Sequence, residues 1–427
     1  MKFIHAADLH LDSPLRGLAA YPDAPVDRLR TATRDALGNL VTLAVAEAVD
    51  FVVIAGDVYD GDWRDFNTGL FFIRQMGRLR QSGIPVYLLH GNHDAESEMT
   101  RGLELPDNVH VFSSRRTETF RIDALKVALH GRSFKVAATT ENLLPGYPAP
   151  VPGWLNVGVL HTALEGNAEH ANYAPCSIAE LEARGYQYWA LGHVHQHWIR
   201  QGTTTIAYPG NLQGRHIREP GARGALLVTA EGDAITGIER IEVDVLRWHA
   251  LDIDARPLED MRGAARAAGQ AMSRLLDETP GGRPLALRVT FSGGSPAHGA
   301  LTGREALLRQ EVIAQAVALD ADRIWIEKVR IATAPAAGVP GPATADTADA
   351  LAELESLANS ALTDADFLAA LQSDLQDLLE KLPHDVLQAA PELEALRQDP
   401  AQWLPGRVRD AVPILIARVA QGANATD

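Results

Sequence analysis

The 427-residue sequence is poor in cysteine and in long apolar runs. Its single cysteine, Cys176, excludes an intrachain disulfide, which fits a reducing compartment. No apolar stretch approaches the ~18 residues that a membrane-spanning helix needs. The opening segment MKFIHAADLHLD reaches polar residues at once, so it lacks the apolar core of a secretory signal. Together these absences predict a cytoplasmic protein.

Positive charge is also scarce: 39 Lys and Arg stand against 55 Asp and Glu, a net charge of −16. Such acidity argues at first sight against a nucleic-acid partner, because phosphates attract Lys and Arg. The deficit is concentrated, however, in residues 336–427, where 15 acidic and 5 basic residues give −10. The remaining residues carry 40 acidic and 34 basic side chains, or −6. The acidity is mainly a property of the tail and does not exclude DNA.

An Ala-, Pro- and Gly-rich segment divides the chain. Residues 332–349 contain one sizeable apolar side chain, Val339, and are predicted to be a flexible linker. With 46% apolar and 22% charged residues, the composition excludes wholesale disorder, and the length favours two or three domains. We predict a first domain over 1–238, a small α/β domain over 239–331 and a helical region over 350–427.

Short apolar runs alternate with helical stretches in the first domain. The runs KFIHAAD, FVVIAGD, VYLLHGN, NVGVLHT and YWALGHV each stop at a polar or glycine-containing turn, which predicts buried strands. Helices are predicted over 28–48 and 67–81, and the segments VHVF, ETFRI and KVALHG are predicted to form hairpins. This order predicts a layered α/β domain with a mixed sheet or a two-sheet sandwich.

Histidines and carboxylates gather at the ends of these predicted strands. Twelve of the 15 histidines precede residue 220. The motifs are D-x-H at 8–10, G-D-x-x-D at 56–60, G-N-H-D at 91–94, H at 161 and G-H-x-H at 192–195. A lone histidine at a strand end is usually structural, but five such sites predict one ligand cluster at the carboxyl ends of the strands. Sharp turns are expected at Gly56, Gly91 and Gly192.

The residue types in these motifs suit metal-assisted phosphate chemistry. Carboxylate, imidazole and amide oxygen ligands fit Mn²⁺, Fe²⁺ or Zn²⁺, and the lack of cysteine argues against a structural zinc site. A carboxylate can bridge two ions. Paired ions clamp the attacking and leaving oxygens of a phosphoryl displacement and lower the pKa of bound water.

The motif set resembles the calcineurin-like metallophosphoesterase family over roughly residues 1–232. The resemblance implies a four-layer α/β/β/α sandwich with two divalent metal ions, Mn²⁺ in the first place and Fe²⁺, Zn²⁺ or Mg²⁺ as alternatives. The metal ligands that it implies are Asp8, His10, Asp57, Asn92, His161, His193 and His195, with Asp57 bridging. It further implies that His93 is a general acid toward the substrate and that Asp94 orients His93. Asp60 is either a supporting carboxylate or a simple turn residue.

Within the family, the start KFIHAADLHLDSPL and the domain order resemble SbcD-type DNA exonuclease subunits. The segment TIAYPGNLQGRHIREPGARG resembles the YhaO-type subgroup. This implies a DNA repair or end-processing nuclease whose α/β domain over 239–331 caps the catalytic domain and contacts DNA. Candidate basic contacts are Arg16, Arg64, Arg132, Lys135, Arg215, Arg218 and Arg223. We favour Arg215 and Arg218, with His216 and Asn211 beside them, although a solvated surface role is the alternative for any single arginine.

The same resemblance implies a partner, a coiled-coil ATPase of the SbcC/YhaN kind. Two apolar surfaces of the tail are expected to dock on it: the run AVPILIARVA and a stripe of leucines at helical spacing. The stripe consists of Leu371, Leu375, Leu378 and Leu382. The alternative is that these helices pack on one another as a small domain. The helices predicted over 28–48 and 67–81 are a candidate homodimer face, as in relatives.

Two other functions compete with the nuclease. One is a small-molecule phosphodiesterase or phosphoprotein phosphatase of the same superfamily, against which the capping domain and the tail argue, because such enzymes need no docking arm. The other is a non-catalytic scaffold that keeps the fold. The complete ligand set opposes that alternative.

Overall fold

The computed structural model describes residues 1–13, 26–60, 66–96, 104–165, 173–279, 282–336, 345–362 and 364–381, with short pieces between 404 and 419. Two of the candidate basic residues, Arg16 and Arg64, and one leucine of the tail, Leu382, lie outside the described residues. The chain divides into two compact units. The first comprises Met1–Leu251, Leu275–Arg288 and Asp320–Glu327, and the second comprises Asp252–Arg274, Val289–Leu319 and Lys328–Asp427.

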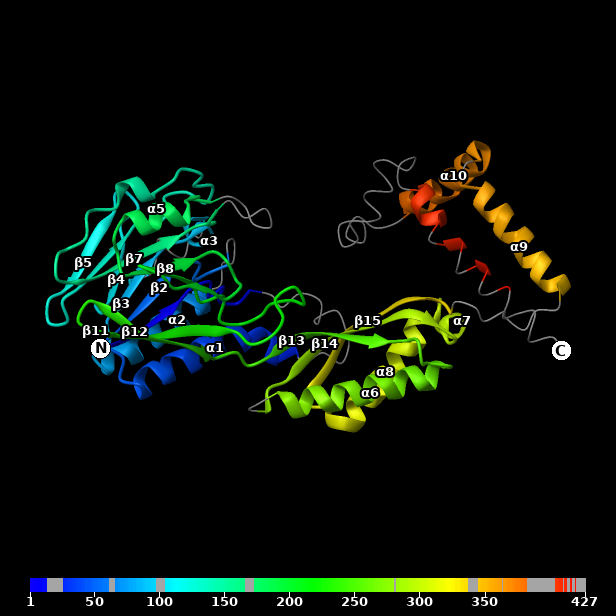
Figure 1. Ribbon diagram of the computed structural model, residues 1–427, viewed down its shortest axis with the longest axis horizontal. Coiled ribbons are helices and arrows are strands. Elements are labelled where there is room, and N and C mark those ends of the chain that lie inside the picture. The colour runs from blue at the N-terminus through cyan, green and yellow to red at the C-terminus, as the bar shows by residue number, and fades with distance from the viewer. Residues whose placement is uncertain are drawn as a thin grey trace. The chain divides into compact units, whose positions relative to one another are not determined.

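The first six-stranded sheet has the order β12-β11-β1-β2-β3-β4 (Figure 1). Its strands are β1 Lys2–Ala6, β2 Phe51–Ala55, β3 Val86–Leu89, β4 Val109–Val111, β11 Gly224–Glu231 and β12 Ala234–Glu242. Strands β1 to β4 run parallel, whereas β11 is antiparallel to both of its neighbours. The segment VHVF was expected in a hairpin and is instead the parallel edge strand β4, because it pairs with β3.

The second six-stranded sheet has the order β5-β6-β7-β8-β10-β9. Its strands are β5 Glu118–Ile122, β6 Val127–Gly131, β7 Leu155–His161, β8 Tyr188–Gly192, β9 Trp198–Arg200 and β10 Thr205–Tyr208. Strands β5 and β6 form the predicted hairpin, and β6, β7, β8 and β10 run parallel. The predicted two-sheet sandwich is therefore confirmed.

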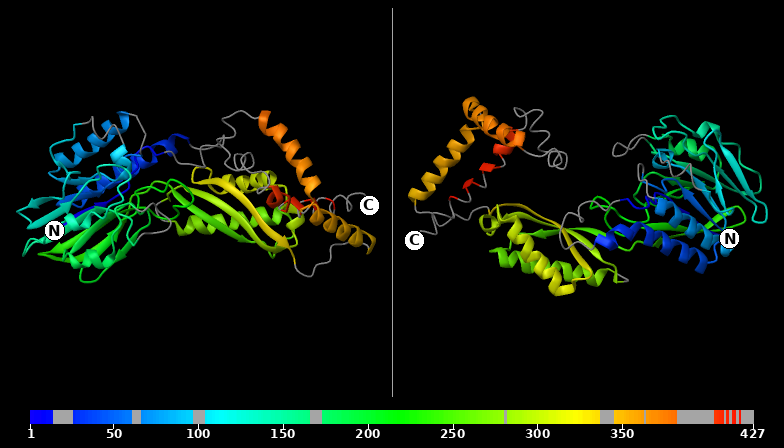
Figure 2. Two further views of the ribbon diagram at one scale, coloured as in Figure 1. Left: turned by 90° about the horizontal axis from the view of Figure 1, so that it is seen from above. Right: turned by 180° about the vertical axis from the view of Figure 1, so that it is seen from behind.

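Helices cover the outer faces of the two sheets (Figure 1, Figure 2). The described helices that accompany the two sheets are α1 Val26–Ala46, α2 Phe66–Gln81, α3 Asn92–Glu96, η1 Leu144–Gly146 and α5 Ile178–Ala183. Alternate residues of β1 serve different cores, since Ile4 packs with the residues of α1 and α2 and Phe3 packs between the sheets. A third core joins Leu181 of α5 to Trp189 of the second sheet. The layers are α/β/β/α, as the family resemblance implied.

The first unit extends beyond the predicted boundary at residue 238. That boundary falls inside β12, whose residue Glu239 pairs with Leu227 of β11. Ile235 and Ile238 of β12 pack against the core between the sheets, and Ile241 belongs to the core under α1 and α2. The isoleucines of this strand recur every third residue, at 235, 238 and 241, instead of at alternate positions, so the sequence does not predict its membership of the sheet.

A three-stranded sheet, β13-β14-β15, follows with helices between its strands. Its elements are β13 Arg247–Asp254, α6 Met261–Glu278, β14 Leu285–Ser295, α7 His298–Leu301, α8 Glu305–Asp320 and β15 Ile324–Pro335. The order strand–helix–strand–helix–strand is the one that the sequence predicts. No helix among the described residues is long and apolar enough to cross a membrane.

The tail contains two described helices, α9 Ala345–Ser360 and α10 Ala365–Lys381. The predicted linker over 332–349 is too long at both ends: its first four residues belong to β15 and its last five to α9. Alanine is the best helix former, which explains why an Ala-rich segment starts a helix. Leu371 and Leu375 are half-buried on α10.

The core between the sheets makes a testable prediction. Phe51 stacks on Phe3 with ring centroids 4.8 Å apart, and both are fully buried. We expect Phe51→Ala to lower the free energy of unfolding by about 3–5 kcal/mol, because it leaves a cavity that the sheets cannot close. Chemical denaturation followed by circular dichroism measures the change. Phe66→Ala is the matched control, since Phe66 is 65% exposed, and equal losses in the two variants would contradict this core assignment.

Candidate metal centre

The candidate ligands come from both sheets and meet at one edge. Residues after β1, β2 and β3 of the first sheet face residues at the ends of β7 and β8 of the second. This is the place where open α/β sheets bind ligands. The side chains brought together are Asp8, His10, Asp57, Asn92, His161, His193 and His195, and all but His195 are buried.

The backbone at this edge is strained. Asp8, His10, Asp57 and His193 have φ angles of 52°, 42°, 55° and 99°, in the left-handed region that side chains avoid. The loops hold one another in place, since the N–H of Asp8 donates to the carbonyl of Gly56 at 3.0 Å. Such conformations persist only where the surroundings enforce them, and they gather at functional sites.

Two glycines let the loops approach one another. A Cβ on Gly91 would lie 2.3 Å from Oδ1 of Asp57, and a Cβ on Gly192 would lie 2.0 Å from the carbonyl oxygen of Ala55. Of the three glycines for which sharp turns were expected, Gly56 alone has a positive φ, 97°. At the other two positions the requirement is close packing against the site.

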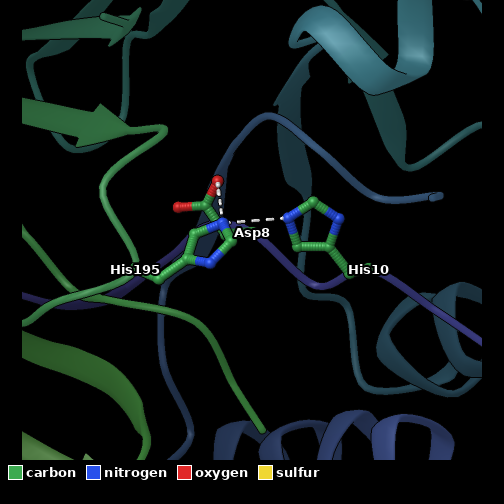
Figure 3. A group of neighbouring side chains, drawn as sticks. All are labelled: Asp8, His10 and His195. Carbon is green, nitrogen blue, oxygen red and sulfur yellow. Dashed lines mark hydrogen bonds and ion pairs between the residues drawn. The ribbon is translucent and has the colours of Figure 1, made fainter. Parts of the chain in front are cut away.

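Asp8, His10 and His195 form the first group whose ligand atoms lie within 4.8 Å of one another (Figure 3). Nε2 of His10 is 3.1 Å from Nε2 of His195, and the latter is 3.9 Å from Oδ1 of Asp8. Burial, and then the charge of Arg215, lower the pKa of His10 to about 3, so its ring is neutral. Imidazoles that converge on a buried carboxylate are a donor set that fits a divalent cation.

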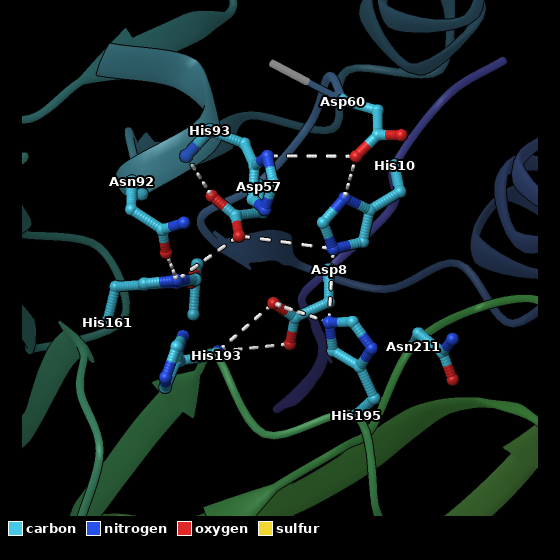
Figure 4. A network of polar contacts seen from close by, with 12 residues as sticks. Asp8, His10, Asp57, Asp60, Asn92, His93, His161, His193, His195 and Asn211 are labelled. Carbon is cyan, nitrogen blue, oxygen red and sulfur yellow. Dashed lines mark hydrogen bonds and ion pairs between the residues drawn. The ribbon is translucent and has the colours of Figure 1, made fainter. Parts of the chain in front are cut away.

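Asp8, Asp57 and His161 form a second group of the same kind (Figure 4). Nδ1 of His161 donates to the carbonyl of Ala55 at 2.9 Å, so Nε2 faces Oδ2 of Asp57 at 3.4 Å and Oδ1 of Asn92 at 3.1 Å. Burial alone would lower the pKa of His161, but Asp57 and then Asp8 outweigh it and raise the pKa to about 9. The two carboxylates thus favour positive charge at this position. Either a proton on His161 or a bound metal cation can provide that charge.

His193 lies beside this second group. Its ring centroid is 5.3 Å from that of His161, and its backbone N–H donates to both oxygens of Asp8 at 3.1 Å. Its imidazole is in none of the groups within 4.8 Å that the described residues form. Burial raises the pKa of Asp8 to about 6, because these donors do not replace the water that the carboxylate loses.

The expected pairing of His93 with Asp94 is wrong. Oδ1 of Asp94 accepts the N–H groups of Val58 and Tyr59 at 2.9 and 3.0 Å, and Oδ2 accepts the N–H of Gly91 at 3.1 Å. The carboxylate near His93 is Asp60, whose Oδ1 is 3.6 Å from Nδ1 of His93. Because both residues lie on helix α3, the neighbours at positions i and i+1 point to different sides.

Glu219 is a site residue that sequence reasoning missed. Its Oε1 accepts a hydrogen bond from Nδ1 of His195 at 2.7 Å, which leaves Nε2 to face Asp8 and His10. Its Oε2 accepts from the backbone N–H of Arg215 at 2.7 Å and from Nδ2 of Asn211 at 3.0 Å. Burial alone would raise the pKa of Glu219, but the hydrogen bond from His195 and the charge of Arg215 outweigh it and hold the pKa well below its usual range. A carboxylate behind a ligating histidine fixes the tautomer and orientation of the ring.

The predicted substrate contacts fall into two groups in the structure: residues that support the loop and residues that line a pocket. Asn211 is 1% exposed and donates to Glu219 and accepts from Arg223, so it supports the loop rather than meeting substrate. Arg215 lies between Asp60 and Glu219. His216 and Arg218 line an open pocket beside His195. Arg223 is buried and lines the same pocket. Arg132 and Lys135 do not line it: Arg132 pairs with Glu141, and Lys135 is exposed.

Two protein-family models match parts of the chain. Residues 1–197 match the calcineurin-like phosphoesterase family, and residues 248–334 match the middle domain of metallophosphoesterase YhaO. The chain is 35% identical to the metallophosphoesterase YhaO of Bacillus subtilis over 301 residues, which cover 69% of this chain and 72% of that protein. The chain belongs to the YhaO-type calcineurin-like metallophosphoesterase family. The family resemblance is confirmed, and with it the class of activity, hydrolysis of phosphate esters.

More distant relatives are DNA double-strand break repair proteins named Mre11. The chain is 24% identical to that of Sulfurisphaera tokodaii over 61% of its own length and 67% of the relative. It is 30% identical to that of Aeropyrum pernix over 59% of its length and 63% of the relative. Divalent metal binding is a property of the family, and the two groups at the strand ends fit it.

The contact between Glu219 and His195 makes a prediction. Glu219→Gln keeps the shape of the side chain but removes the charge that holds Nδ1 of His195. We expect Mn²⁺ affinity, measured by isothermal titration calorimetry, to fall by about 10- to 100-fold. Glu141→Gln is the matched control, because the side chain of Glu141 is 67% exposed and its pair with Arg132 is at the surface. Unchanged Mn²⁺ binding in Glu219→Gln would contradict the orienting role.

Proposed function

We propose that this protein is a metal-dependent DNA nuclease that hydrolyses phosphodiester bonds with two divalent ions. One observation carries the proposal: a single oxygen of Asp57, Oδ2, faces both groups, at 3.9 Å from Nε2 of His10 and 3.4 Å from Nε2 of His161. A buried carboxylate between two sets of ligands is what a bridged pair of cations requires.

The proposed ligands divide into two sets that share Asp57. The first set is Asp57 with Asp8, His10 and His195, and the second is Asp57 with Asn92, His161 and His193. Oxygen and imidazole ligands without cysteine favour Mn²⁺, with Fe²⁺, Zn²⁺ or Mg²⁺ as alternatives. When bound, such a pair supplies charge to polarise the phosphate and lowers the pKa of water near neutrality.

His93 is the proposed proton donor to the leaving oxygen, the 3′-oxygen of the preceding nucleotide. Its side chain is 37% exposed, so it can reach substrate, and its ring lies 5.0 Å from that of His10. Its backbone N–H donates to Oδ1 of Asp57 at 3.0 Å, which fixes its position relative to the bridge. We assign the orienting role to Asp60, the carboxylate 3.6 Å from Nδ1.

DNA is the favoured substrate because the Mre11 relatives are DNA repair proteins and because the chain carries elements that a small-molecule esterase does not need. These are the YhaO-type middle domain and the tail helices. We propose that α10 docks on a coiled-coil ATPase of the SbcC/YhaN kind through the half-buried side of its leucine stripe.

The nuclease proposal is tested with purified protein and Mn²⁺, with linear duplex DNA and small phosphodiesters or phosphomonoesters as substrates, with and without the ATPase. We expect DNA to be hydrolysed and EDTA to abolish that hydrolysis, because the buried carboxylates need their cations. Turnover of the small esters alone, also in the presence of the ATPase, would show a different phosphoesterase. Mn²⁺ binding without turnover of any substrate would favour a scaffold.

His93 provides the sharpest mechanistic test. We expect His93→Gln to lower kcat on DNA by about 10²- to 10⁴-fold, the usual contribution of a positioned acid. Mn²⁺ binding by calorimetry should persist in this variant, because His93 is not among the proposed ligands. His110→Gln is the matched control, since His110 stacks on Tyr87 away from the strand ends. Full activity of His93→Gln would exclude the assigned proton transfer.

The docking proposal is tested on the full chain. Leu371→Asp with Leu375→Asp places two charges on the half-buried side of α10, and Ser373→Asp with Gln376→Asp places the same charges on its exposed side. We expect the leucine pair to weaken binding to the coiled-coil ATPase by at least about 10-fold in a calorimetric titration, and the control pair to change it little. Equal binding by both variants would exclude this surface.

A further inference from the structure

A pocket of about 980 Å³ opens next to the candidate metal centre. Two segments line it, His195–His197 at the end of β8 and Arg215–Arg223 after β10, and Arg240 of β12 completes the wall. All of these residues belong to the first compact unit. His195 is shared, because it lines the pocket and also belongs to the group of Asp8 and His10.

The lining is cationic although the chain is acidic. Four arginines line the pocket, Arg215, Arg218, Arg223 and Arg240, against one carboxylate, that of Glu219. The carboxylate of Glu219 is engaged by internal donors and offers no free charge to a ligand. Among the described residues, no carboxylate forms an ion pair with Arg218 or Arg240, and both are exposed.

The wall of the pocket is fixed before any ligand arrives. Nε1 of the fully buried Trp248 donates to the carbonyl of Gly214 at 2.9 Å, and Nε2 of Gln213 donates to the carbonyl of Leu246 at 2.8 Å. Arg223 bonds Oδ1 of Asn211 at 3.1 Å. A segment pinned in this way loses little entropy when it binds, which favours a built binding site over a surface patch.

We propose that this pocket binds the sugar–phosphate backbone of a single nucleic-acid strand next to the phosphate at the metal centre, an inference that rests on the proposed function. Arginine forks match phosphate oxygens, and two exposed arginines suit successive phosphates. Among the described residues, no Phe, Tyr or Trp lines the pocket, so it lacks the large aromatic platforms that single-strand binders use to stack bases. Contacts to the backbone alone give binding without sequence preference.

The test removes the two exposed arginines together. Binding of a fluorescein-labelled oligothymidylate to the full chain is followed by fluorescence polarisation in EDTA, so that no hydrolysis interferes. We expect Arg218→Ala with Arg240→Ala to raise Kd by at least about 10-fold. The slope of log Kd against log salt should fall by about 1.4, since each phosphate contact on a single strand contributes about 0.7.

Arg115→Ala with Arg116→Ala is the matched control. These arginines are exposed before β5, and neither lines the pocket, so the variant makes the same change in net charge elsewhere. We expect its Kd to stay within about two-fold of the unmodified chain. Equal weakening in the two double variants would show a diffuse charge effect and overturn the pocket. Arg218→Lys with Arg240→Lys keeps both charges, so the slope of log Kd against log salt should stay unchanged. A fall in that slope at an unchanged unfolding temperature would also overturn the pocket proposal.

The outcomes separate this inference from the proposed function. If the unmodified chain does not hydrolyse DNA but the variant without Arg218 and Arg240 loses oligothymidylate binding, the nuclease proposal is overturned and the pocket proposal is supported. If the unmodified chain hydrolyses DNA but the variant without both arginines binds oligothymidylate normally, only the pocket proposal is overturned. A phosphoserine peptide that binds more tightly than oligothymidylate, and depends on the same arginines, would overturn the assignment to nucleic acid.

Discussion

The burial of three carboxylates, those of Asp8, Asp57 and Asp94, at the ends of the first sheet is the constraint on which the rest of the site depends. A buried charge is costly unless it is paired or hydrogen-bonded. Asp94 accepts hydrogen bonds from three backbone N–H groups, whereas Asp8 accepts one from the backbone N–H of His193 and lies 3.9 Å from Nε2 of His195. Asp57 relies on His161 and on the N–H of His93. The loops that provide these hydrogen-bond partners also carry the candidate metal ligands. The contacts that stabilise the buried carboxylates therefore also bring the ligands together.

This arrangement needs a rigid frame. The left-handed conformations of Asp8, His10 and Asp57 oppose folding locally, as does the close packing at Gly192. The apolar cores on either side of the first sheet, with residues such as Phe3 and Phe51 fully buried, stabilise the strands from which the loops leave. The strained geometry persists because the strands cannot move apart to relieve it.

Most of the candidate site could be predicted from the sequence because its residues end strands that are largely apolar, and such runs are recognisable one at a time. Glu219 was missed because it lies 24 residues after His195, in a loop without periodicity. Asp94 was misassigned because adjacency in the sequence does not mean contact on a helix. Strand β4 pairs with β3 across a segment that contains α3, which local pattern does not reveal. Strand β12 pairs with its neighbour β11, but its apolar residues lack the alternation that marks a strand in the sequence.

Charge placement reconciles the acidity of the chain with the proposed nucleic-acid ligand. At physiological ionic strength, screening confines exposed charges to about 8 Å, so phosphate binding depends on local composition rather than on the net charge of −16. The pocket beside His195 has an excess of arginine, whereas the strand ends have an excess of carboxylate. Cations bound by those carboxylates would reverse the local sign there. If the pocket binds a strand as proposed, metal loading and strand binding are coupled through His195, which both sites share, and through Glu219, which accepts a hydrogen bond from its ring.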